Sequence, residues 1–99
     1  MKYRDLLRVD PAVLHLPGSR PQGADPGKLQ RQLSRYGKSV LGMPPLFVSR
    51  GNDGELVIND GVTRATRVAK LLPGQLVEVE IIDDLNAPVG HLPRVGEKL

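Results

Sequence analysis

The stretch from residue 46 to residue 82 constrains the fold most, because it switches from a strand pattern to a helix pattern and back. Leu46-Phe47-Val48 and residues 55–59 are short apolar runs that flank Gly51-Asn52-Asp53-Gly54. This tetrapeptide predicts a β-hairpin, because Asn, Asp and Gly tolerate the positive φ angles of tight turns. Residues 76–82 then alternate apolar and acidic side chains, which is typical of a strand with one buried face.

Two helices are predicted around these strands. The first is signalled by Asp25-Pro26, an N-cap followed by a residue whose φ is already fixed, and Gly37 ends it. Its apolar stripe has the spacing i, i+4 and i+7 and consists of Leu29, Leu33 and Tyr36. The second helix is expected from about residue 62 to residue 72, where Pro73-Gly74 stops it.

Aromatic residues make up only 3% of the chain, so Val, Leu and Ile must fill the core, and these residues suit a small sheet covered by helices. We therefore predict an α/β fold, a small mixed β-sheet of about four strands packed with two main helices, in residues 25–82. Residues 1–24 are expected to be an extended arm with a short strand near Val13, Leu14 and Leu16. Residues 83–99 are expected to be a C-terminal tail that is poorly ordered unless it docks.

The composition excludes several classes of function. The chain has no cysteine, which removes disulfides, thiolate chemistry and cysteine-based zinc sites. It contains no apolar run near the ~20 residues that a membrane span needs, and its charged N-terminus lacks the apolar core of a signal peptide. A cytoplasmic protein with no membrane partner is therefore expected. The net charge of +3 favours anionic partners only mildly.

The segment Asp60-Gly61-Val62-Thr63-Arg64 joins a predicted strand to a predicted helix and carries the main functional signal. A helix N-terminus exposes unpaired backbone N–H groups and the positive end of the helix dipole. Gly61 lets the backbone approach a ligand closely, Thr63 can donate a hydroxyl group, and Arg64 adds a permanently charged, forked donor. Together they predict a site for a phosphate, which Arg67 would extend one turn later.

Other interpretations of the charged residues stay open. Asp60 is either a turn residue or the one carboxylate well placed for catalysis, and Asp83-Asp84 read as an acidic strand-end loop. His15 and His91 have no carboxylate at ligand spacing, so we predict no metal site. A basic stripe at spacings of three and four is either a solvated helix face or a nucleic-acid surface, and it consists of Lys28, Arg31, Arg35 and Lys38.

The order of elements in residues 29–82 is itself informative. The first helix is followed by the entry Gly42-Met43-Pro44-Pro45 into a strand, then by the Asp53-Gly54 hairpin. Next come a strand and Gly61-Val62-Thr63-Arg64, which has the form Gly-x-x-Arg, before the second helix and a last hydrophobic strand. This arrangement resembles the ParB/sulfiredoxin-like superfamily, often labelled ParB-like nuclease domains. An arginine after an early strand, as Arg20 is, also fits that family.

In that family the Gly-x-x-Arg segment binds nucleotide phosphates. The resemblance therefore implies that Gly61, Thr63 and Arg64 contact phosphate, that Arg20 is a second clamp, and that the ligand is a nucleotide with or without magnesium. Sulfiredoxins need a cysteine in this motif, so their activity is excluded here. The chromosome-partition members often carry an acidic residue where Val62 stands, and a following DNA-binding domain that these 99 residues do not hold.

We therefore expect a ParB-like nucleotide- or phosphate-binding domain. One alternative is a nuclease or phosphoryl-transfer enzyme on the same scaffold, which needs a general base or metal-binding carboxylates near the phosphate, with Asp60 as the first candidate. The other alternative is a DNA-binding or protein-interaction module without a small ligand, which would depend on the basic stripe. Whether the protein is an enzyme, and its oligomeric state, are left open at this point.

Overall fold

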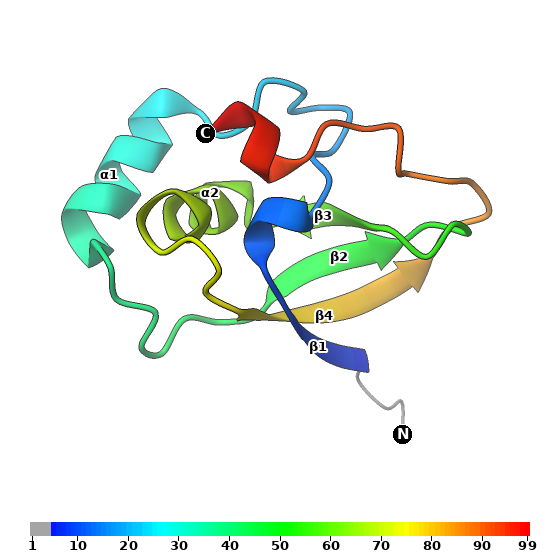
Figure 1. Ribbon diagram of the computed structural model, residues 1–99, viewed down its shortest axis with the longest axis horizontal. Helices are drawn as coiled ribbons and strands as arrows, with labels where there is room; N and C mark the ends of the chain where they lie inside the picture. Colours follow the sequence, from blue (N-terminus) through cyan, green and yellow to red (C-terminus); the bar gives the residue numbers. More distant parts are fainter. Residues whose placement is uncertain (1–4) are drawn as a thin grey trace.

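A computed structural model describes residues 5–99, and its central feature is a four-stranded mixed sheet (Figure 1). The order across the sheet is β1-β4-β2-β3; β4 pairs antiparallel with β1 and parallel with β2, and β2 pairs antiparallel with β3. The strands are β1 Asp5–Val9, β2 Leu46–Arg50, β3 Leu56–Asp60 and β4 Val77–Asp84. The predicted fold class, a small mixed sheet with two main helices, is confirmed.

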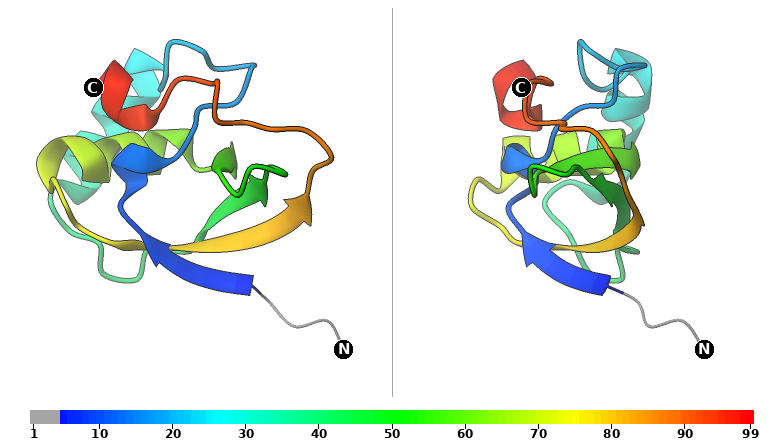
Figure 2. Two further views of the ribbon diagram at one scale, coloured as in Figure 1. Left: turned by 45° about the vertical axis from the view of Figure 1, so that its right-hand side comes forward. Right: turned by 90° about the vertical axis from the view of Figure 1, so that its right-hand side faces the viewer.

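The two helices, α1 Pro26–Tyr36 and α2 Val62–Leu71, lie on the same side of the sheet (Figure 2). α2 buries an apolar face that includes Ala65 and Val68 in the core, whereas α1 contacts α2 and buries none of its residues completely. Neither helix, nor any other within residues 5–99, has the length and apolar character that crossing a bilayer requires. α1 therefore forms an outer wall beside α2 instead of a second layer over the strands.

The local signals for α1 act as the sequence predicts. The carboxylate of Asp25 accepts a hydrogen bond from the backbone N–H of Lys28 at 3.0 Å, and Pro26 is the first helical residue. Gly37 ends the helix with φ +51°. The last strand runs two residues further than predicted, to Asp84, because Arg50 of β2 pairs with Asp84 and holds its carboxylate at 2.7 Å.

Part of the expected N-terminal arm belongs to the sheet instead. Asp5–Val9 is an edge strand paired with β4, while residues 1–4 of the expected arm lie outside the described residues. The prediction of a short strand near Val13, Leu14 and Leu16 is wrong for Val13. Pro11–Val13 forms a 3₁₀ turn, η1, with Asp10 as its cap. Residues 14–16 follow in extended conformation, and there His15 forms isolated bridges to β3 and to residue 94.

The C-terminal tail docks on the core. The backbone N–H of Leu16 donates to Pro93 O at 2.7 Å, and the N–H of Val95 donates to Leu14 O at 2.9 Å. Val95 opens a second 3₁₀ turn, η2 Val95–Lys98, and its side chain is buried among the core residues. The hydrophobic core therefore extends beyond residues 25–82 on both sides and includes side chains from both expected flanking segments.

Candidate functional site

The start of α2 has the open geometry that an anion site needs. Gly61 is the N-cap residue with φ +115°, and no side chain caps the helix. The first helical hydrogen bond runs from the N–H of Ala65 to Gly61 O at 2.9 Å, so the amides of residues 62–64 have no acceptor within the helix. A Cβ at position 61 would lie 2.5 Å from Cδ2 of Leu46, so this turn requires glycine for space as well as for φ.

A cavity of about 400 Å³, here called the polar cavity, opens at this helix start. Its walls come from the loop before α1, from the first turns of α1 and from residues 59–64. Gly61, Thr63 and Arg64 line it together with Arg20, so the structure brings four of the five predicted phosphate contacts into one cavity. Lys28, predicted as part of the basic stripe, lines it as well.

The charges in the polar cavity favour an anion. Three cations line it, Arg20, Lys28 and Arg64, against two carboxylates. Both carboxylates are engaged: Asp25 caps α1, and the backbone N–H of Lys28 holds the pKa of that carboxyl below its usual value. Asp60 lies 3.6 Å from the guanidinium of Arg64. The cationic side chains and the positive end of the α2 dipole therefore add to a field that attracts negative oxygen atoms.

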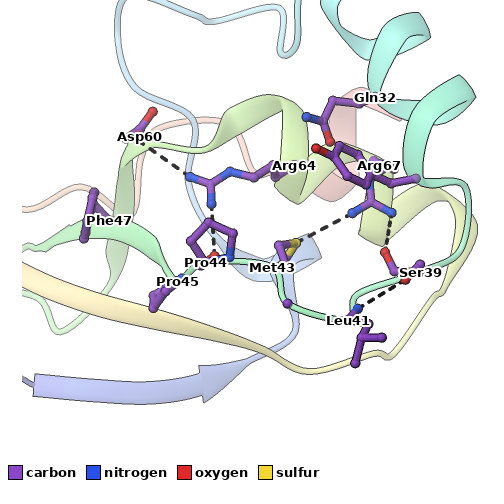
Figure 3. A pocket seen from close by; sticks show the side chains of 12 residues that line it. Gln32, Ser39, Leu41, Met43, Pro44, Pro45, Phe47, Asp60, Arg64 and Arg67 are labelled. Carbon is purple, nitrogen blue, oxygen red and sulfur yellow. Dashed lines mark hydrogen bonds and ion pairs between the residues drawn. The ribbon is translucent and has the colours of Figure 1, made fainter.

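Arg64 forms the wall between the polar cavity and a neighbouring cavity (Figure 3). Its Nη1 donates to Pro44 O at 3.0 Å, and the side chain is 18% exposed. This hydrogen bond uses one of the five N–H donors of the guanidinium, so others stay available to a ligand. The carbonyl of Pro44 thus helps to fix the position of Arg64.

Arg67 does not line the polar cavity, so its predicted role in extending the phosphate patch is wrong. Its side chain is 2% exposed and donates to Gly37 O at 2.7 Å and to Ser39 O at 2.8 Å, with Met43 Sδ at 3.7 Å. These acceptors hold the connection after α1 against α2. Burial lowers the pKa of this guanidinium from its usual value. The physical reason for the error is that Nη1 of Arg67 donates to two backbone carbonyls about 30 residues away in the sequence, which hold the side chain inside the protein.

The basic stripe borders the site. Lys28, Arg31 and Arg35 line a shallow groove of about 300 Å³ that includes Thr63 at the start of α2, and Lys28 and Thr63 also line the polar cavity. Lys38 follows the helix end and does not line the groove. Three of the four predicted residues therefore continue the positive surface outward from the polar cavity.

The acidic residues singled out in the sequence have different partners in the structure. Asp60, the catalytic candidate, is 71% exposed and pairs with Arg64. Asp84 pairs with Arg50. Asp53 accepts hydrogen bonds from the N–H groups of Val89 and Gly90, which lower the pKa of its carboxyl and tie the hairpin to the C-terminal segment. Within residues 5–99, no three His, Cys, Asp or Glu side chains form a group suited to a metal ion.

No pattern in the sequence indicates the cluster around His15, in which the His15 ring is buried and its partners Glu55 and Arg94 are partly exposed. Its Nδ1 lies 2.7 Å from Leu92 O, and its Nε2 lies 2.9 Å from Oε1 of Glu55, which also accepts from Arg94 at 3.2 Å. The bonds from His15 and Arg94 hold the pKa of the Glu55 carboxyl below its usual value. This cluster fastens the C-terminal segment and does not belong to the polar cavity.

Sequence reasoning also missed a cavity on the other side of Arg64, which we call the apolar cavity. It measures about 340 Å³ and lies between α1, the connection after it, and the start of β2. Gly42 and Pro44-Pro45 were the signal in the sequence, since they interrupt regular structure in the connection after α1.

Comparison of the chain with protein-family models, with curated proteins and with solved structures finds no match.

Proposed function

We propose that this protein is a ParB-like binding domain that holds a nucleotide or another phosphate-bearing ligand in the polar cavity. The observation that carries the proposal is the convergence of Arg20, Lys28 and Arg64 on the uncapped start of α2. These residues come from three separate segments of the chain, so local sequence preference does not explain their meeting.

The physical chemistry of the site suits phosphate in particular. Free amides at a helix N-terminus point toward a bound anion, and the helix dipole favours negative charge there. Arginine forms paired hydrogen bonds with phosphate oxygens, and two arginines, Arg20 and Arg64, line this cavity. The Gly-x-x-Arg form of residues 61–64 and the order of elements add support through the family resemblance. A cytoplasmic location, which the sequence favours, would provide nucleotides as ligands.

The proposal is tested by calorimetric titration with tripolyphosphate and with nucleoside triphosphates, each with and without magnesium. Arg20→Ala should weaken binding by about tenfold or more, because a hydrogen bond to a charged group is worth about 1.5–3 kcal/mol. Arg8→Ala on the exposed β1 edge is the matched control and should leave binding unchanged. Equal affinities in the two variants, or no binding by the native protein, would contradict the proposal.

A second candidate, binding of a nucleic-acid backbone, is favoured by the groove beside the polar cavity. Lys28, Arg31 and Arg35 could contact further phosphates of a chain whose first phosphate lies at α2. The affinity for DNA should then fall steeply as the salt concentration rises. Arg31→Ala should reduce the slope of log affinity against log salt concentration by about the value of one phosphate contact. Salt-insensitive binding would argue for a small ligand only. We propose no reaction, because both carboxylates of the polar cavity are already engaged.

A further inference from the structure

The mouth of the apolar cavity carries apolar side chains that remain in contact with water. Tyr36, Leu41 and Phe47 line the cavity and are 43%, 95% and 36% exposed. In Figure 3, Leu41 lies on the connection after α1 with its side chain turned away from Arg67. A small molecule confined to this cavity of about 340 Å³ would leave Leu41 in water, whereas a chain lying across the mouth would cover it. Exposed apolar surface of this kind is typical of protein-interaction sites.

Leu41 is held in one place although it is exposed. Nη1 of Arg67 donates to Ser39 O at 2.8 Å, and the N–H of Leu41 donates to Oγ of Ser39 at 3.3 Å. The N–H of Met43 donates to Val40 O at 3.2 Å and closes a turn that contains Leu41. A surface that is fixed before binding loses little conformational entropy when a partner binds. Leu41 is therefore a preformed contact.

Cations border this mouth. The guanidinium carbon of Arg35 lies 5.4 Å from the centre of the Tyr36 ring, and Lys38 is exposed after the helix end. The basic stripe continues this border, because the shallow groove shares Tyr36 with the apolar cavity. Within residues 5–99, Asp60 is the one carboxylate that lines the cavity, and it pairs with Arg64 at 3.6 Å. The border therefore favours a partner with negative side chains, since complementary charges give an interface its specificity.

We propose that the mouth of the apolar cavity binds an acidic amphipathic peptide segment of a partner protein. One large apolar side chain of the segment enters the cavity, its backbone covers Leu41, and its carboxylates face Arg35 and Lys38. This site is separate from the polar cavity, so the inference goes beyond the proposed function and does not depend on it. A nucleic-acid strand fits less well, because bases stack on aromatic side chains and would gain little from Leu41.

The partner is unidentified, so the probe is a phage-displayed library of random short peptides. The library is selected on the immobilised full chain and, in parallel, on the Leu41→Ser variant. Leu41 is 95% exposed, so this variant should fold with an unchanged melting temperature, and Leu41→Gln serves if that temperature falls. Peptides enriched on the native chain alone should carry Leu, Phe or Trp with Asp or Glu beside it. If no peptide prefers the native chain, or if the preferred peptides lack acidic residues, the proposal is refuted.

The affinity for the most enriched peptide is then measured by fluorescence anisotropy. Leu41→Ser should weaken binding about tenfold or more, because burial of a leucine side chain contributes at least that factor. Ile82→Ser, at an exposed residue that lines neither cavity, is its control and should leave the affinity unchanged.

A second pair of variants tests the charges. Lys38→Glu should weaken binding of the same peptide by about threefold, and added salt should weaken it as well. Lys98→Glu, at an exposed residue of η2, is the control and should have no effect. Equal effects of the two charge reversals would contradict the basic border as the specific contact.

The remaining outcomes identify a different occupant. Arg20 lines only the polar cavity, so Arg20→Ala should keep the peptide affinity; a loss as large as that of Leu41→Ser would place the peptide in the polar cavity and overturn the proposal. Binding of a single-stranded oligonucleotide that requires Leu41, without any enriched peptide, would assign the mouth to nucleic acid instead. Failure of the native chain to bind tripolyphosphate or nucleotides would refute the proposed function and leave the peptide site standing.

Discussion

Replacing Gly61 with alanine perturbs the turn that exposes the amides of α2. Gly61 has φ +115° and ψ 19°, a region that L-residues with a Cβ rarely adopt. The new Cβ would also lie 2.5 Å from Cδ2 of Leu46, a completely buried side chain, and 3.1 Å from Nη2 of Arg64. The substitution therefore combines backbone strain with overpacking of the core.

The two effects can be given magnitudes. A left-handed conformation costs an L-residue about 1–2 kcal/mol, and overpacking a filled core costs about 1–3 kcal/mol. We expect Gly61→Ala to lower the free energy of unfolding by roughly 2–5 kcal/mol, a large share of the 5–15 kcal/mol typical of a domain. Phosphate affinity should fall as well, because the displaced Arg64 borders the polar cavity.

Urea denaturation provides the measurement. If the substitution changes only stability, the urea concentration at the midpoint shifts while the dependence of the unfolding free energy on urea stays constant. Gly74→Ala is the matched control: φ is +85° there, but no atom lies within 4 Å of the added Cβ. It should show the backbone cost alone, about 1–2 kcal/mol. Equal losses in the two variants would refute the packing contribution of Leu46, and a near-neutral Gly61→Ala would refute the tight turn itself.

Two further predictions concern the C-terminal segment. His15 and Arg94 lower the pKa of the Glu55 carboxyl in the folded protein. The ionised carboxylate therefore stabilises the fold at a pH above the usual pKa of a glutamate, and this stabilisation is lost as the pH falls below about 4. Glu55→Gln should flatten the dependence of melting temperature on pH in that window, and exposed Glu97→Gln should not. Val95→Ala should cost roughly 1–3 kcal/mol in urea denaturation, because this side chain is completely buried. Val13→Ala, at a half-exposed site, is its control, and equal effects would refute the docking of the tail.

Local signals predicted much of the fold. The cap at Asp25, the stop at Gly37, the hairpin at residues 51–54 and the glycine before α2 act within a few residues, so their chemistry is visible in the sequence. The pairing of β1 with β4 and the burial of Val95 depend on partners about 70 to 80 residues away. No periodicity in the sequence encodes such contacts, so these two segments were expected to lie outside the domain.

The candidate site also contains residues that the sequence could predict and residues that it could not. The open helix start at Gly61 and Arg64 was evident from residue types, whereas Arg20 was assigned only through the family resemblance. Arg67 was misplaced because a charged residue one turn after Arg64 was assumed to remain at the surface. The backbone carbonyls of Gly37 and Ser39 bind it instead, and nothing in the sequence marks these two carbonyls as its partners.

Residues 14–16 bridge β3 and the segment around Arg94, and this arrangement affects how the chain folds during its synthesis. The loop that carries Arg20 begins directly after this extended segment, so its anchorage is incomplete until residue 95 has left the ribosome. Contacts of such sequence separation slow folding, because a large loop must close before they form. A nascent chain halted before this point would expose Leu14 and Leu16, and we expect it to be a substrate for chaperones.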